Sequence, residues 1–107
     1  MTSPRVDLER SDRPPAVVAR LHGEIDSSNA AEVLLPLADE AGGSRLILAF
    51  DDVQYIDSAG MAAIEILRSA SALAIVAPEH SVVRRALEIV GFDQLLPVVN
   101  RVEDVPA

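Results

Sequence analysis

Two short, continuously apolar runs constrain the fold of this 107-residue chain more than any other feature. Leu46–Phe50 and Ala72–Ala77 contain no polar side chain, as expected for central strands that are buried on both faces of a sheet. Segments with the spacing of amphipathic helices precede and follow these runs. Because strands that alternate with helices usually pair in parallel, the pattern predicts an α/β domain with a mostly parallel sheet and helices packed on it.

The N-terminal part of the chain adds a hairpin to this sheet. Val6 and Leu8 alternate with charged residues, which is typical of a half-exposed edge strand. Ala16–Leu21 is a clearer strand, and Ser11–Pro15 between the two is rich in turn-forming residues. The sequence therefore predicts an N-terminal hairpin, and so a mixed sheet.

One helix is predicted over Asn29–Ala41, after the polar segment that follows the hairpin. Gly42-Gly43 ends it, since glycine readily adopts the left-handed backbone of a helix C-terminus. Pro36 lies inside the helix and should kink it, because proline has no backbone N–H to donate. The residues expected to face inward are Val33, Leu34, Leu37 and Ala41.

The C-terminal third contains a helix and a last strand. The helix is predicted over Ser81–Val90 and is ended by Gly91. Leu95–Val99 is expected at an edge of the sheet, because Pro97 cannot donate a hydrogen bond to a neighbouring strand. The residues of the helix expected to face inward include Val82, Leu87 and Val90.

Charge and composition narrow the classes of function. Nine arginines against seventeen acidic residues give a net charge of −8, which disfavours direct binding to nucleic acid or to an anionic membrane surface. Lysine is absent, so Schiff-base chemistry and a phosphate-loop lysine are excluded. Cysteine is absent too, which excludes disulfides and thiolate sites.

The length predicts a single domain over residues 1–107, with residues 1–4 and 101–107 frayed. No apolar run approaches the roughly 20 residues that span a membrane. The polar N-terminus also lacks the apolar core of a signal peptide. A cytoplasmic location is therefore expected.

The polar turn Asp57–Gly60 joins the strand at Leu46–Phe50 to a helix whose apolar spacing includes Met61, Ile64 and Leu67. Ser58 is predicted to be the N-cap of that helix, where its hydroxyl would accept a backbone N–H. A hydroxyl there is exposed and fixed in place. A phosphate on it would meet free backbone N–H groups and the positive end of the helix dipole, so the turn is also a plausible regulatory site.

Acidic residues follow the predicted strands, and one interpretation is a magnesium-dependent phospho-acceptor pocket. A bacterial receiver domain would have such a pocket, but it also needs a lysine, which this chain lacks. The other interpretation is that Asp51 and Asp52 are turn-forming, solvated charges. The four carboxylates in question are Asp26, Asp51, Asp52 and Asp57.

Serine catalysis would need a base beside Ser58. His22 leaves a predicted strand and His80 begins a predicted helix, and nothing in their positions brings either one to Ser58. The Gly-x-Ser-x-Gly elbow of serine hydrolases is also absent. The chain is therefore not expected to be an enzyme, and no catalytic residue, cofactor or metal ligand is predicted.

Four segments together resemble one known family. Val53–Met61, with the sequence VQYIDSAGM, resembles the signature of STAS domains, specifically the bacterial anti-sigma factor antagonists. Leu21–Asp26, Leu46–Phe50 and Val82–Phe92 resemble, in order, the Leu-x-Gly-Glu-Leu-Asp segment, the strand before the signature and the late helix with its glycine stop. The similarity extends over Val17–Val99, nearly the whole domain.

This resemblance implies a function. The unmodified antagonist binds an anti-sigma factor that is also a serine kinase, and so frees a sigma factor. The kinase then phosphorylates the serine after the signature aspartate, which corresponds to Ser58, and a serine phosphatase reverses the change. The expected partner-binding residues are Asp26, Asp57, Ser58, Ala59, Gly60 and Met61.

Two other functions are compatible with the sequence. The chain could be a constitutive accessory subunit of a lipid-transporting ATPase complex, with the same turn as a docking surface and no switch. Nucleotide or small-ligand binding is a third possibility, but no glycine-rich phosphate loop or lysine supports it.

The sequence departs from the family pattern at two places. Ala59 stands where many members have a second hydroxyl, which leaves Ser58 as the one acceptor in the turn. The segment Gly60–Pro78 is about one helical turn shorter than usual, so the surface formed by this helix, and with it the choice of partner, is expected to differ.

Overall fold

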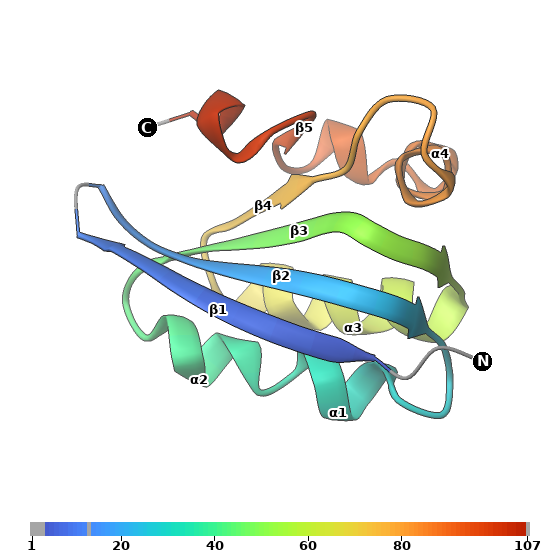
Figure 1. Ribbon diagram of the computed structural model, residues 1–107, viewed down its shortest axis with the longest axis horizontal. Helices are drawn as coiled ribbons and strands as arrows, with labels where there is room; N and C mark the ends of the chain where they lie inside the picture. The colour runs from blue at the N-terminus through green and yellow to red at the C-terminus, as the bar shows by residue number, and fades with distance from the viewer. Residues whose placement is uncertain (1–3, 13, 107) are drawn as a thin grey trace.

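The computed structural model describes residues 4–12 and 14–106 and consists of one five-stranded sheet with helices (Figure 1). The strands lie in the order β1-β2-β3-β4-β5. β1 and β2 are antiparallel, and every other neighbouring pair is parallel. The predicted mixed, mostly parallel sheet with an N-terminal hairpin is confirmed. The strands are β1 (Arg5–Asp12), β2 (Pro15–Ile25), β3 (Arg45–Ile56), β4 (Leu73–Val76) and β5 (Val98–Val99).

Strands β2 and β3 are longer than the sequence predicts. β2 continues past Leu21 to Ile25 through two register shifts against β3, with Gly23 at a φ of 93°. β3 likewise continues past Phe50 to Ile56. The continuously apolar runs cover only the first part of each strand. Beyond them the burial of β2 alternates between neighbouring residues and that of β3 is irregular, and both parts were missed.

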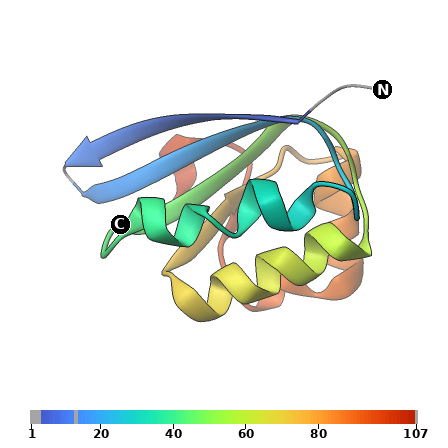
Figure 2. The same ribbon diagram turned by 90° about the horizontal axis from the view of Figure 1, so that it is seen from below.

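The helices cover one face of the sheet, and this side holds the larger core (Figure 2). Leu48 and Phe50 on β3 are buried beneath them. Helix α3 contributes Ile64 and Leu67, and α4 contributes Leu87. The helices are α1 (Ala30–Leu34), α2 (Leu37–Ala41), α3 (Ser58–Ala70) and α4 (Val82–Val90).

The predicted helix at Asn29–Ala41 is two short helices, α1 and α2, rather than one kinked helix. Pro36 lies between them and serves as the N-cap residue of α2, because a proline cannot continue the hydrogen-bond ladder of α1. The chain turns away from α2 at Gly42, whose φ is 58°. Of the residues predicted to face inward, Leu34, Leu37 and Ala41 are buried and Val33 is half-buried.

The inward face of α4 was predicted correctly at Leu87 and incorrectly at Val82 and Val90. Val83 and Leu87, four residues apart, are buried, whereas Val82 and Val90 are 60% and 54% exposed. Ile89 is exposed as well. Apolar side chains therefore lie on both the buried and the solvent side of α4, and helical spacing alone does not distinguish the two.

The last strand is at the edge of the sheet, as predicted, but it contains only Val98 and Val99. A short 3₁₀ helix, η1 (Phe92–Gln94), occupies the preceding chain. Pro97 contributes to the sheet as an acceptor, since its carbonyl oxygen receives the N–H of Ile75 at 2.8 Å. The missing N–H of Pro97 therefore does not disturb the pairing.

The C-terminal segment is folded where fraying was expected. Val102–Asp104 form a 3₁₀ helix, η2, and Val102 and Val105 pack on the face of the sheet opposite the helices. This second, smaller core contains Ile47 of β3 and Val76 of β4. Ala107 and residues 1–3, also predicted to fray, lie outside the described residues.

Replacing both Val102 and Val105 by alanine should lower the free energy of unfolding by about 1–2 kcal/mol, because each loses part of a half-buried side chain at about 0.8 kcal/mol per buried methylene. Urea unfolding of the full chain measures this. The control is Glu103→Ala, since Glu103 is exposed on the same turn. Equal stability of the two variants would contradict the packing of this segment.

Candidate functional site

The candidate site lies where β2 and β3 end (Figure 1). Ile25 and Ile56 are neighbours in the parallel register, so the loops that follow them leave the sheet side by side. One loop leads from Asp26 into α1, and the other leads through Asp57 into α3. The N–H of Asp57 donates to the carbonyl oxygen of Ile25 at 3.2 Å, which joins the loops at their base.

Asp57, and not Ser58, is the N-cap of α3. One carboxylate oxygen, Oδ1, accepts the N–H groups of Ala59 at 2.9 Å and Gly60 at 3.2 Å. The other, Oδ2, accepts the N–H of Ser27 from the neighbouring loop at 3.2 Å. Asp57 has the extended backbone of a cap residue, with φ −113° and ψ −170°, and Ser58 is the first residue of the helix. A carboxylate cap of this kind stabilises a helix by about 1 kcal/mol.

Ser58 is exposed at the start of α3 and takes no part in the cap. The expectation that a phosphate there would meet free N–H groups needs correction. The N–H groups of Ala59 and Gly60 are bound by the Asp57 side chain, and that of Met61 donates to the Asp57 carbonyl oxygen at 3.1 Å. A new anionic group on Ser58 would therefore find these donors already occupied.

Gly60 allows the first turn of α3 to approach the sheet closely. A Cβ atom at this position would lie 2.5 Å from Cγ1 of Ile56 and 3.2 Å from Cγ2 of Ile25. Any larger side chain would push the helix start away from the ends of β2 and β3. Ala59 is half-buried beside it and packs against the main core.

Asp26 lies in the neighbouring loop and is held by Ser28. Its Oδ1 accepts the Ser28 hydroxyl at 2.5 Å and the Ser28 N–H at 2.9 Å. The hydroxyl contact first, and then the N–H contact, lower the pKa of the Asp26 carboxyl. Because the folded-state pKa lies below the unfolded one, this loop gains stability above the unfolded-state pKa and loses it as the pH falls through the lowered value.

A shallow groove of about 240 Å³ runs beside the Asp57–Ser58 turn and separates it from α4. Asp57, Ser58 and Met61 lie on one side of it. Ile89 and Val90 lie on the α4 side, and Ile89 is 74% exposed. We call this the α3–α4 groove; its lining residues are Ile56, Asp57, Ser58, Met61, Ala86, Ile89 and Val90.

The six predicted partner-binding residues lie close together, but only three of them line the α3–α4 groove. Asp57, Ser58 and Met61 line the α3–α4 groove, Ala59 and Gly60 form the first turn of α3, and Asp26 lies in the adjoining loop. The α4 side of the groove was missed, because Val90 was predicted to face inward. Burial of Val83 and Leu87 places Ile89 on the exposed side of α4, whereas Val90, seven residues after Val83, shares their side by helical spacing and is exposed at the last residue of the helix.

The carboxylates considered for a magnesium pocket do not share one loop. Asp51 and Asp52 lie within β3 rather than in a turn after it. Asp52 contacts Nδ1 of His22 at 3.1 Å, and Asp7 contacts Nε2 of the same ring at 2.9 Å, so His22 connects β1, β2 and β3. Among the residues that the structure describes, no three His, Asp or Glu side chains are arranged to hold a metal ion.

His80 precedes α4 in a left-handed backbone conformation, with a φ of 69°.

In the part of the chain that is described, no helix is long and apolar enough to cross a membrane.

Comparison with known proteins relates this fold to one family. The sequence model of the STAS domain matches residues 5–105. An anti-sigma factor antagonist from Mycobacterium paratuberculosis has a similar structure, with a TM-score of 0.80 and 21% identity over 95% of this chain and 90% of that chain. The anti-sigma factor antagonist SpoIIAA in its unphosphorylated form has a TM-score of 0.62 and 21% identity over 94% of this chain and 92% of that one.

The phosphorylated form of SpoIIAA, a Bacillus cell fate determinant, has a TM-score of 0.58 and 19% identity, over 92% of this chain and 95% of that one. No relative was found among curated protein sequences.

Replacing Asp57 by alanine should lower the free energy of unfolding by about 1–2 kcal/mol, since the helix cap and the acceptor for Ser27 are both lost. Asp57→Asn keeps a side-chain oxygen for the cap and should lower the free energy of unfolding by less than Asp57→Ala does. Asp51→Ala, at an exposed aspartate of β3, is the control and should stay within about 0.5 kcal/mol of the unmodified chain. The cap assignment fails if Asp57→Ala and Asp51→Ala give the same urea midpoint.

Proposed function

Because the chain belongs to the STAS domain family, we propose that it is an anti-sigma factor antagonist that is switched by phosphorylation of Ser58. In the unmodified state it binds an anti-sigma factor serine kinase and so releases a sigma factor. The observation that carries the proposal is an exposed serine hydroxyl at the first residue of α3, beside an apolar groove. The fold that it shares with structures described as anti-sigma factor antagonists supports the same role.

The unmodified surface suits a protein partner. Ile89 and Val90 are exposed on α4, and Met61 lies across the groove from them. Burying one such apolar side chain stabilises a complex by about 1.5–3 kcal/mol. Asp57 contributes little unpaired charge to the contact, since its two carboxylate oxygens accept three backbone N–H groups. The partner therefore meets an apolar surface with a small hydroxyl at its border.

Phosphorylation would change the charge of this surface and leave the fold intact. It adds about −1.5 to −2 charge at neutral pH. The N–H groups of Ala59, Gly60 and Met61 already donate to Asp57, so these three donors are not free to receive the phosphate. Docking would bury that charge without a partner, which costs several kcal/mol, and each 1.4 kcal/mol reduces affinity about tenfold.

In this proposal the chain is a substrate of the kinase and of a serine phosphatase, and it has no enzymatic activity of its own. Both ring nitrogens of His22 contact carboxylates, of Asp7 and Asp52, so His22 is engaged in the sheet rather than beside Ser58. His80 is not among the residues that line the groove. Neither histidine serves as a base for the Ser58 hydroxyl.

Ser58→Ala should remain bound to the anti-sigma factor kinase during incubation with ATP, whereas Ser58→Asp should bind at least about tenfold more weakly, because it places a carboxylate at the docking surface. Affinity capture from cytosol, followed by identification of an ATP-dependent serine kinase and phosphopeptide mapping, measures both effects. The control is Ser69→Asp, the same change at an exposed serine in the last turn of α3.

Phosphate found only at other residues would overturn the assignment of Ser58. Capture of a transporter ATPase in place of a kinase, equally by the unmodified chain and by Ser58→Asp, would instead indicate an accessory subunit without a switch.

Ile89→Asp should weaken kinase binding at least about tenfold, because it replaces an apolar side chain of the α3–α4 groove by a charge. Ile66→Asp is the matched control: Ile66 is 55% exposed on α3 and does not line the groove. Both variants should unfold at the same urea concentration as the unmodified chain, since neither residue is buried. Equal kinase affinities of the two variants would exclude the groove from the interface.

A further inference from the structure

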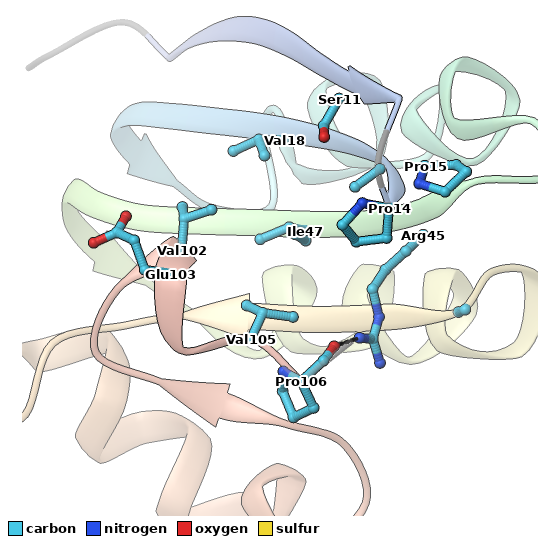
Figure 3. A pocket seen from close by; sticks show the side chains of 12 residues that line it. Ser11, Pro14, Pro15, Val18, Arg45, Ile47, Val102, Glu103, Val105 and Pro106 are labelled. Atoms are coloured by element: carbon cyan, nitrogen blue, oxygen red, sulfur yellow. Dashed lines mark hydrogen bonds between the residues drawn. The ribbon is translucent and has the colours of Figure 1, made fainter.

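A second, larger cleft lies on the opposite face of the sheet (Figure 3). Its volume is about 480 Å³, which falls within the roughly 300–1,000 Å³ of small-molecule sites. It is found at the beginning of β2 and β3, close to Ala16 and Arg45, whereas the Asp57–Ser58 turn follows the ends of these strands. The two sites are thus separated by the length of the sheet.

Three separate segments of the chain form the walls of this cleft. Val18 and Ile47 of the sheet form its apolar floor. Val105 and Pro106 of the C-terminal segment form one side, and Pro14 and Pro15 form another (Figure 3). The lining is mostly apolar, which suits a hydrocarbon ligand.

The charged groups of the cleft lie at its two ends. The side chains of Arg45 and Glu103 are far apart in Figure 3, with Ile47 and Val105 between them. Arg45 is half-buried, and its Nη1 donates to the carbonyl oxygen of Pro106. A guanidinium carries five N–H donors, so this bond leaves donors with which Arg45 can bind a carboxylate.

We propose that this cleft binds a small amphipathic monocarboxylate, with its aliphatic chain on the floor of Val18 and Ile47 and its carboxylate on Arg45. Among the residues that the structure describes, the lining contains one guanidinium and one opposing carboxylate, which suits a ligand with a single negative charge. A nucleotide or another polyanion is disfavoured, because Glu103 lines the same cleft and the whole chain carries a net charge of −8.

This proposal does not depend on the function proposed for Ser58, because none of the described residues lines both the cleft and the α3–α4 groove. A ligand bound here would leave the Asp57–Ser58 turn accessible to a protein partner. It would also stabilise the folded chain, by a free energy that grows with the logarithm of its concentration over its dissociation constant, because the cleft needs the hairpin, β3 and the C-terminal segment together.

The probe is decanoate, titrated into the ¹⁵N-labelled full chain below its micelle-forming concentration and followed by amide chemical shifts. Shifts should concentrate at the cleft, around Ala16, Ile47 and Val102–Val105, and decanoate should bind at least about tenfold more tightly than decanol or decylamine. Absence of binding, or shifts centred on the α3–α4 groove, would overturn the site. Equal affinity for decanoate and decanol would overturn the role of Arg45.

Substitutions test separately where the carboxylate of decanoate binds and where its aliphatic chain binds. Arg45→Gln should weaken the binding of decanoate at least about tenfold and leave the affinity for decanol unchanged. Arg101→Gln removes an arginine that does not line the cleft, so it should leave the affinity for decanoate unchanged. Glu103→Gln should not weaken the binding of decanoate. Val105→Trp should fill the cleft and abolish binding.

Unchanged melting temperatures without ligand confirm that the variants are folded. Full affinity of Val105→Trp, or equal loss in Arg45→Gln and Arg101→Gln, would contradict the proposal.

Discussion

The carboxylate of Asp57 is the contact on which the functional end of the molecule depends. It caps α3 through Ala59 and Gly60 and receives the N–H of Ser27 from the neighbouring loop, so one side chain fixes both loops that follow the central strands. The parallel register of Ile25 and Ile56 brings these loops together, and Gly60 permits the close approach of the helix. The position of Ser58 at the surface follows from this arrangement.

The mixed, mostly parallel sheet and its N-terminal hairpin could be predicted because local patterns determine them. Continuous apolar runs mark the strands buried on both faces, and the alternation in β1 marks an edge. Beyond these runs the burial of β2 alternates between neighbouring residues and that of β3 is irregular, and the two strands were predicted too short. The C-terminal segment was expected to fray because it is a chain terminus, and its two packing residues, Val102 and Val105, lie among charged ones that give no apolar pattern.

The candidate site was only partly predictable for a different reason. Asp57 and Ser58 are adjacent and both belong to residue types that cap helices, so the backbone angles at residue 57 decide between them. On α4, apolar residues occupy both the buried and the exposed side, and the register becomes clear only when Val83 and Leu87 meet the sheet. The exposure of Ile89 follows from that register, whereas Val90 is exposed because it is the last residue of the helix.

The C-terminal segment gives the two faces of the sheet unequal resistance to local unfolding. The face covered by the helices is buried by most of the chain, whereas the described residues cover the other face mainly through Val99, Val102 and Val105. Separating η2 from the sheet breaks these few contacts and the bond of Arg45 to Pro106, and leaves the hairpin and β3 paired. Amide hydrogens of residues 102–105 therefore exchange through a local opening, at a smaller free energy than global unfolding.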